Sequence, residues 1–295
     1  MRYFSAVIIC LTIGLVWSLS KPAQALGAIT GDFSFSHLSM THQSLNGLIE
    51  NLPALEPSED SLKVQALLAE GDVFYRRLDN QLAIQTYRKA FLVDSTSFPV
   101  LSRLSRTATD LGNDFSAADQ KSAAEELFLE AVTYAEGLQR HHSDSAKTHF
   151  YLALSKGSLA LFIGGRRKVS FSREIEAHCK RGLAIDPTDA QLLVVYGLFN
   201  REVASSSWME RTLAQALFGQ IPEGTKENAV SLLSRAVEED PDLHVARFEL
   251  SLSLIAVGRP EEAIVHLKQA EALPAQTTQD NRNRQLAKRM LERIP

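Results

Sequence analysis

The sequence predicts an all-helical protein, a right-handed solenoid of about five helix pairs with one additional helix inserted into the array. Apolar residues recur with helical spacing from about residue 60 onward, and glycine and proline fall between the helical stretches. A second observation is a repeated pattern: a mostly small residue, a bulky one four positions later and a small one seven positions later. The five copies of this pattern are Ala83/Tyr87/Ala90, Ala124/Phe128/Ala131, Ile175/Cys179/Gly182, Ala229/Leu233/Ala236 and Ala263/Leu267/Ala270.

The third observation is the spacing between copies. Ala229 and Ala263 lie 34 residues apart, which is the period of a tetratricopeptide repeat. Ile175 and Ala229 are 54 residues apart, one period plus an insertion of 20 residues. Small residues let the two helices of a pair approach closely, and the bulky residue fills the space between repeats. The matching small positions on the first helices are expected at Gly71, Gly157, Gly197 and Ser251.

Residues 1–25 are predicted to be a secretory signal. Arg2 supplies a positive start, residues 6–19 are apolar, and Ala-Gln-Ala at 23–25 is a small-x-small cleavage site. This stretch of 14 residues is shorter than the ~20 residues that span a bilayer as a helix. We therefore expect export to the periplasm or the extracellular space, in a secreted protein of bacterial style. The alternative is an uncleaved anchor, and membrane association is expected only in that case.

Two further segments follow the predicted signal. Residues 26–60 are interpreted as a linker with at most one short helix, which Pro53 and Pro57 separate from the repeats. Residues 61–295 are predicted to form the repeat domain.

Charge and cysteine content exclude several classes of protein. The chain has a net charge of -4, and removal of residues 1–25 would leave -6, so bulk nucleic-acid binding is not expected. The two cysteines are Cys10 and Cys179, too few for a disulfide framework or a cysteine-rich zinc module. Cys179 occupies a bulky core position and is expected to be an inert buried thiol.

Residues 171–291 resemble the regulator-of-microtubule-dynamics family, a tetratricopeptide-like group. The resemblance rests on Arg173-Glu174-Ile175 through Ile185-Asp186-Pro187, Tyr196-Gly197 through Ser206-Ser207-Trp208-Met209-Glu210-Arg211, Leu217-Phe218-Gly219 with Pro222, Glu239-Asp240-Pro241 and Leu273-Pro274-Ala275. It implies an all-helical, non-enzymatic domain, and the family's eukaryotic members are linked to microtubules or organelle contact sites. The predicted signal and the acidic charge disfavour a microtubule role here, because tubulin itself is acidic.

An inserted helix is predicted at 207–217. Ser207 and Glu210 have the spacing of a capping box, and Gly219 with Pro222 ends the segment. Its apolar residues suggest a structural helix that packs into the solenoid; the alternative is a lid or a partner-binding helix. The candidate residues are Trp208, Met209, Leu213, Leu217 and Phe218.

The first helix of each repeat should line the concave surface, which projects as a mostly apolar groove. Such a groove fits an apolar ligand or an amphipathic helix better than a charged peptide, unless the insert covers it. The projected residues are Tyr151, Leu154, Leu161, Phe162, Val194, Leu198, Arg201, Val245, Phe248, Leu252 and Ile255, with Glu202 near the end of its helix.

Other candidate sites are weak. Arg166 and Arg167 follow two glycines, and we interpret them as a solvated basic turn, with contact to an anionic lipid headgroup as the alternative. The His141-His142 pair with His149 does not specify a metal site. We expect no metal and no cofactor, and no arrangement of nucleophile and base stands out.

The sequence therefore favours a non-catalytic, exported scaffold that binds a protein or peptide partner. The first alternative is a lipid- or apolar-ligand-binding module that uses the concave groove.

Overall fold

The computed structural model describes residues 58–206 and 222–293, and these residues form helices without strands. Five helix pairs and a final helix follow one another along this part of the chain. They are α3 (Glu59–Arg76) with α4 (Asn80–Val93), α5 (Phe98–Ala117) with α6 (Lys121–His141), α7 (Ala146–Ile163) with α8 (Gly165–Ile185), α9 (Ala190–Ser205) with α11 (Lys226–Glu239), α12 (His244–Ala256) with α13 (Pro260–Ala272), and α14 (Thr278–Leu291). The predicted count of about five pairs is confirmed.

The repeated small–bulky–small pattern forms the core of each pair. Its bulky members Tyr87, Phe128, Cys179, Leu233 and Leu267 are at most 1% exposed. Each lies on the second helix of its pair, as the packing of solenoid repeats predicts.

Glycines allow the bulky residues to reach the first helix. A Cβ at Gly71 would lie 2.4 Å from the Tyr87 ring, and a Cβ at Gly197 would lie 2.7 Å from Leu233. Two of the expected close approaches are therefore present. Gly157 is different, because a Cβ there would meet nothing within 4 Å.

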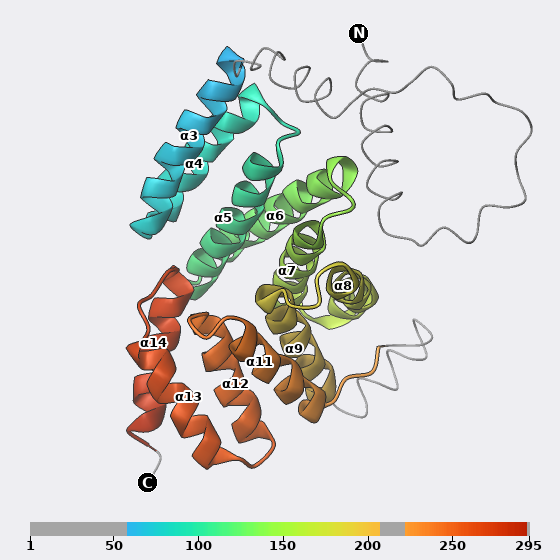
Figure 1. The fold of residues 1–295 in the computed structure, drawn as a ribbon, viewed down its shortest axis with the longest axis vertical. Coiled ribbons are helices and arrows are strands. Elements are labelled where there is room, and N and C mark those ends of the chain that lie inside the picture. The colour runs from blue at the N-terminus through green and yellow to red at the C-terminus, as the bar shows by residue number, and fades with distance from the viewer. Residues whose placement is uncertain (1–57, 207–221, 294–295) are drawn as a thin grey trace, which may run out of the picture. The chain divides into compact units, whose positions relative to one another are not determined.

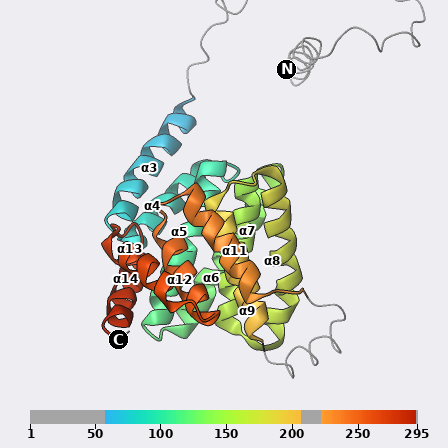
Figure 2. The same cartoon turned by 60° about the horizontal axis from the view of Figure 1, so that its bottom comes forward.

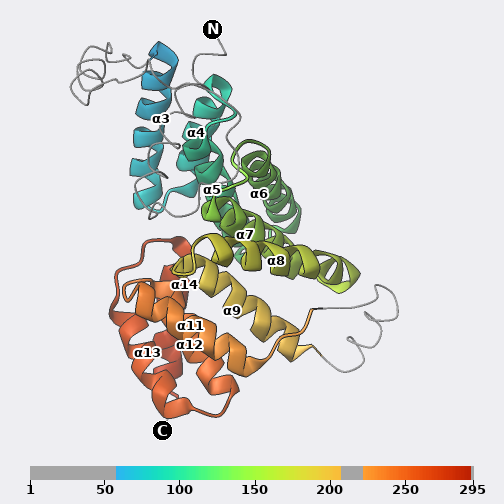
Figure 3. The ribbon, with the colours of Figure 1, turned by 45° about the vertical axis from the view of Figure 1, so that its right-hand side comes forward.

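Consecutive pairs stack into one continuous array. Figure 1 shows the succession from α3 to α14, and Figure 2 shows α7, α8 and α9 packed side by side. In Figure 3, α11, α12 and α13 follow one another below α9. The last helix, α14, packs on α12 and α13 and also contacts α5 from the second pair. This return contact closes the helices from α5 to α14 into a ring.

The helix ends follow local sequence signals. Asp79, Asp189 and Thr225 accept hydrogen bonds from first-turn amides of α4, α9 and α11. At the start of α14, Thr277 and Asp280 form a reciprocal capping box. That box explains why a helix starts soon after residue 274, and it is the sequence signal for α14, which the repeat pattern did not predict.

Two histidines meet in the core between α7 and α8. The Nδ1 atoms of His149 and His178 lie 3.2 Å apart, and both side chains are buried. Burial, followed by the charge of His149, lowers the pKa of His178 to about 4. Burial also lowers the pKa of His149.

We expect this pair to make the protein acid-sensitive. The folded pKa of His178 lies below the ordinary histidine value of 6.5, so its stabilising contribution is complete above pH 6.5 and is lost as pH falls toward 4. Solvent screening should hold the loss below the ~3 kcal/mol that the full shift would represent. Urea unfolding of wild type and His178→Gln at pH 4 to 7 measures it. The free energy of unfolding of wild type, relative to that of His178→Gln, should fall as pH falls from 6.5 toward 4. A difference between the two proteins that stays constant with pH would contradict the prediction.

Candidate functional site

A cavity of about 540 Å³ lies inside the ring. Its wall is built from α5, α7, α8, α9, α12 and α14, together with Ser206 and Pro222. The first helices of four repeats therefore contribute to one space, and α14 completes it. Ligand pockets in proteins have volumes of roughly 300–1,000 Å³.

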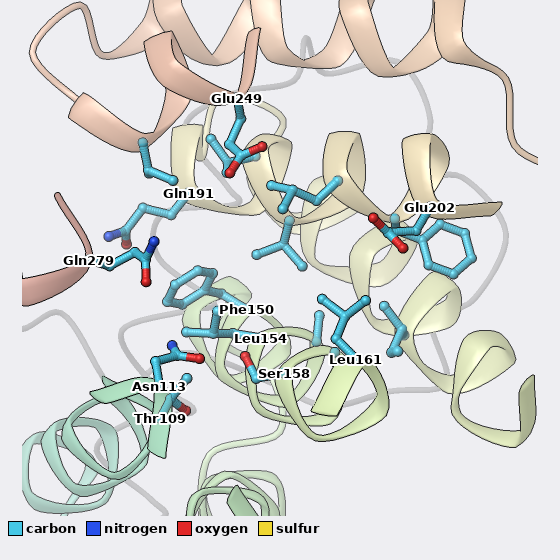
Figure 4. A pocket seen from close by; sticks show the side chains of 18 of the residues that line it. Thr109, Asn113, Phe150, Leu154, Ser158, Leu161, Gln191, Glu202, Glu249 and Gln279 are labelled. Carbon is cyan, nitrogen blue, oxygen red and sulfur yellow. The ribbon is translucent and has the colours of Figure 1, made fainter. Parts of the chain in front are cut away.

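One wall of the cavity is apolar. Phe150, Leu154 and Leu161 lie on one face of α7, and Val194 and Leu198 lie on the facing side of α9, at the helical spacings of four and seven. Figure 4 shows the labelled α7 side chains pointing into the space between these helices. The wall also includes Gly157, where a Cβ would meet no other atom within 4 Å.

The opposite end of the cavity is polar. On α5 the lining residues are Arg106, Thr109, Asp110 and Asn113, again one helical face. At and just before the start of α14 they are Gln276, Thr277, Gln279, Asp280 and Asn283. The side chains of Thr109, Asn113 and Gln279 approach the cavity from these two helices in Figure 4. The cavity thus has an apolar side and an end rich in hydrogen-bonding groups.

Asp110 is the most perturbed acid of the polar end. Its Oδ2 accepts a 2.7 Å hydrogen bond from the Tyr75 hydroxyl, and the Arg106 guanidinium lies 4.8 Å from the centre of the Tyr75 ring. Burial raises the pKa of Asp110 to about 6, more than the Arg106 charge and the Tyr75 hydrogen bond lower it. The Asp110 carboxylate is therefore costly to hold ionised.

Asp280 is an acid with the opposite behaviour. Burial by itself would raise its pKa, but the neighbouring His244 imidazole and hydrogen bonds from the Thr277 and Gln276 amides hold the pKa below its ordinary value. The His244 Nδ1 atom lies 3.3 Å from Asp280 Oδ1, and the His244 side chain is 2% exposed. Asp280 therefore fixes the start of α14 against α12 as a charged group.

Half of the twelve projected groove residues line the cavity. Tyr151 instead packs into the apolar core, and Phe162 packs against Phe128. Arg201 forms an ion pair with Glu249, whose side chain does line the cavity. The six that line it are Leu154, Leu161, Val194, Leu198, Glu202 and Val245.

On α12 three of the four projected residues lie away from the cavity. Phe248 is 3% exposed in a cluster with Leu267 and Ala287, and Leu252 packs against the same cluster. Ile255 is 38% exposed and lies outside the cavity. Helix α14 covers Phe248 and Leu252, so that Val245 and Glu249 form the cavity side of α12 instead.

The polar end of the cavity was not predicted. Its α14 half lies beyond the repeat pattern, and the groove residues that the sequence predicts start at the third repeat. A signal for the α5 half is nevertheless present in the sequence, because Arg106, Asp110 and Asn113 recur at a spacing of four and three. That spacing places them on one helical face, which the structure turns toward the cavity.

The remaining predicted site residues are only partly described. Trp208, Met209, Leu213, Leu217 and Phe218 lie outside the described residues. Arg166 and Arg167 fall in the first turn of α8, whose backbone is helical, while their side chains lie outside the described part of the chain. The basic stretch is thus a helix start rather than a turn.

The histidines between residues 141 and 149 do not form one cluster, because His142 and His149 contact different partners. His142 Nε2 is 2.8 Å from the Thr96 carbonyl, whereas His149 pairs with His178. Within residues 58–206 and 222–293, no group of three or more histidine, cysteine, aspartate or glutamate side chains could hold a metal ion. In the same ranges, no helix has both the length and the apolar character needed to cross a bilayer.

Stacked helix pairs with a pattern of small and bulky core residues define a protein of the tetratricopeptide-like class. A solved tetratricopeptide-repeat protein of Thermus thermophilus has the same fold, with a TM-score of 0.56, 18% identity and coverage of 78% of this chain and 99% of that one. The family model described as "Regulator of microtubule dynamics protein 1-3" matches residues 67–295, and the chain belongs to that family.

Relatives at low identity agree with this assignment. The chain is 25% identical over 223 residues to regulator of microtubule dynamics protein 1 of Mus musculus, covering 74% of this chain and 70% of the relative. It is 22% identical over 255 residues to the Bos taurus protein of the same name, covering 86% and 79%. It spans about half (49%) of protein 3 of Mus musculus, at 24% identity over 77% of this chain.

Proposed function

We propose that this chain is a non-catalytic helical-repeat protein that binds one apolar ligand, such as a lipid acyl chain, in the ring cavity. The observation that carries the proposal is the space of about 540 Å³ with an apolar wall on α7 and α9. An apolar wall favours a ligand that transfers hydrocarbon out of water. The family and the fold both support a binding role rather than a catalytic one.

A protein or peptide partner, which the sequence favours first, is the second candidate here. Leu161 supports it, because this cavity residue is 50% exposed and could be reached by an apolar side chain of a partner. The contact between α5 and α14 makes it the weaker candidate, since a closed ring leaves little room for an extended partner along the concave face.

Export through residues 1–25 is part of the proposal. A periplasmic or extracellular location would separate the protein from the cytoskeleton. We therefore do not propose that this chain regulates microtubules, as the names of its relatives say of them. Fractionation of the native host, with the processed N-terminus sequenced, tests this: a mature chain that begins at residue 26 is expected.

Leu161→Asp tests the ligand site. A carboxylate at this half-exposed position should leave the fold intact but place a charge against bound hydrocarbon. We expect its affinity for the fluorescent acyl probe 11-(dansylamino)undecanoic acid to fall at least about tenfold, the equivalent of ~1.4 kcal/mol. Fluorescence titration measures the affinity.

Ile255→Asp is the matched control, because Ile255 is 38% exposed and lies outside the cavity. It should bind the probe like wild type. Native mass spectrometry of protein gently purified from its own host should also show a co-purifying lipid mass. The absence of that mass, together with no probe binding by wild type, would refute the ligand proposal. A peptide that binds while the probe does not would favour the second candidate.

A further inference from the structure

The contact that closes the ring differs from the other contacts between helices. Apolar clusters join α3 through α7, α7 through α9, α9 through α13, and α12 through α14. No apolar cluster of the described residues spans α5 and α14. The side-chain contacts seen between α5 and α14 are instead hydrogen bonds and an ion pair.

Asp114 of α5 is the centre of that polar contact. Its Oδ1 accepts hydrogen bonds from Thr278 Oγ1 at 2.7 Å and from Arg282 Nη1 at 2.6 Å. Its Oδ2 accepts a bond of 2.9 Å from Asn80 Nδ2, and Asn80 also donates to Thr278. One carboxylate thus connects α4 of the first pair, α5 of the second pair and the last helix, α14.

The position of Asp114 has no local explanation. An acid in the last turn of α5 is unfavourable for the dipole of its own helix. At the first turn of α14 the same charge is favourable, because the unpaired amides there carry partial positive charge. Asp114 instead makes tertiary contacts with Asn80 of α4 and with Thr278 and Arg282 of α14.

On both helices that meet at Asp114, α5 and α14, a residue next to the contact lines the cavity. Asn113 precedes Asp114 on α5, and Gln279 follows Thr278 on α14. A change in the separation of α5 and α14 would therefore change the width of the polar end of the cavity. Polar contacts exchange with water at a small net cost, whereas separation of an apolar cluster exposes hydrocarbon, so the ring should open here first.

We infer that Asp114 is a positioning residue: its carboxylate closes the ring and sets the cavity width, so that ligand affinity depends on closure. The inference rests on the proposed function, because it concerns the affinity of the same cavity. Coupling of this kind is reciprocal, so a ligand that prefers the closed ring also strengthens closure.

The test combines a ring measurement with a binding measurement. Spin labels at Ser116→Cys and Gln285→Cys, both exposed positions, report the separation of α5 and α14 by double electron–electron resonance. The background carries Cys10→Ser, and Cys179 is buried. Asp114→Ala should broaden and lengthen this distance and should weaken binding of 11-(dansylamino)undecanoic acid by about tenfold, within the range of measured couplings. Asp114→Asn, which keeps one acceptor oxygen, should lie between.

Glu262→Ala is the matched control, because it removes an acid from an exposed ion pair with Arg259 at the start of α13. It should change neither the distance nor the affinity. An unchanged label distance in Asp114→Ala, or a changed distance with wild-type affinity, would overturn the inference. If wild type binds no probe, the proposed function fails, and the affinity part of the inference fails with it. The distance between the spin labels still decides whether Asp114 closes the ring.

Discussion

Phe248→Asp is expected to unfold the C-terminal repeats rather than to weaken ligand binding selectively. Phe248 is 3% exposed and packs against Leu267 of α13 and Ala287 of α14. The substitution removes the aromatic contacts and buries a carboxylate in an apolar cluster. The loss should exceed about 4 kcal/mol in the free energy of unfolding, since removal of a buried phenylalanine alone costs about 3–5 kcal/mol.

Chemical denaturation followed by circular dichroism measures this loss. Leu286→Asp is the control, because Leu286 lies on α14 but is 39% exposed. Its effect should stay within about 0.5 kcal/mol. A Phe248→Asp protein with wild-type stability and lost probe binding would show instead that this face of α12 binds the ligand.

Asp110→Asn is expected to stabilise the protein at neutral pH. The Asp110 carboxylate has a pKa raised to about 6 by burial, so folding above that pH holds an ionised group in an unfavourable place. Asparagine keeps an acceptor for the Tyr75 hydroxyl without the charge. A shift from the ordinary value of 3.8 to about 6 corresponds to about 3 kcal/mol.

The sign of the pH dependence separates Asp110 from the histidine pair. The folded pKa of Asp110 is raised, so its penalty is absent below pH 3.8, grows as pH rises to 6 and is constant above. His178 acts in the opposite direction over nearly the same range. The stability of wild type minus that of Asp110→Asn, from urea unfolding at pH 3.5 to 7.5, should therefore fall with rising pH. A difference that does not change with pH would contradict the assignment.

An unfavourable acid kept in a cavity wall is consistent with a binding role. Natural proteins retain destabilising groups where function requires them. Asp110, Asn113 and Asp114 lie within about one turn of α5, and each faces either the cavity or the contact that closes it.

The helix pairs could be predicted from sequence because their packing follows local spacing. A bulky residue such as Tyr87 or Leu233 needs a small partner such as Gly71 or Gly197, and the helical period sets where that partner stands. The cavity face of α7 and α9 follows from the same period, which is why Leu154 and Val194 could be placed at the cavity.

The sequence by itself thus determined the helix pairs, their number and the core of each pair. Only the tertiary structure decided that α14 covers Phe248, that Asp114 meets Thr278 and Arg282, and that four repeats and α14 share one cavity. The physical reason is the distance along the chain. Contacts within a repeat join residues a helix or two apart and leave a periodic pattern, whereas the closing contacts join residues 164 and 168 positions apart and leave none.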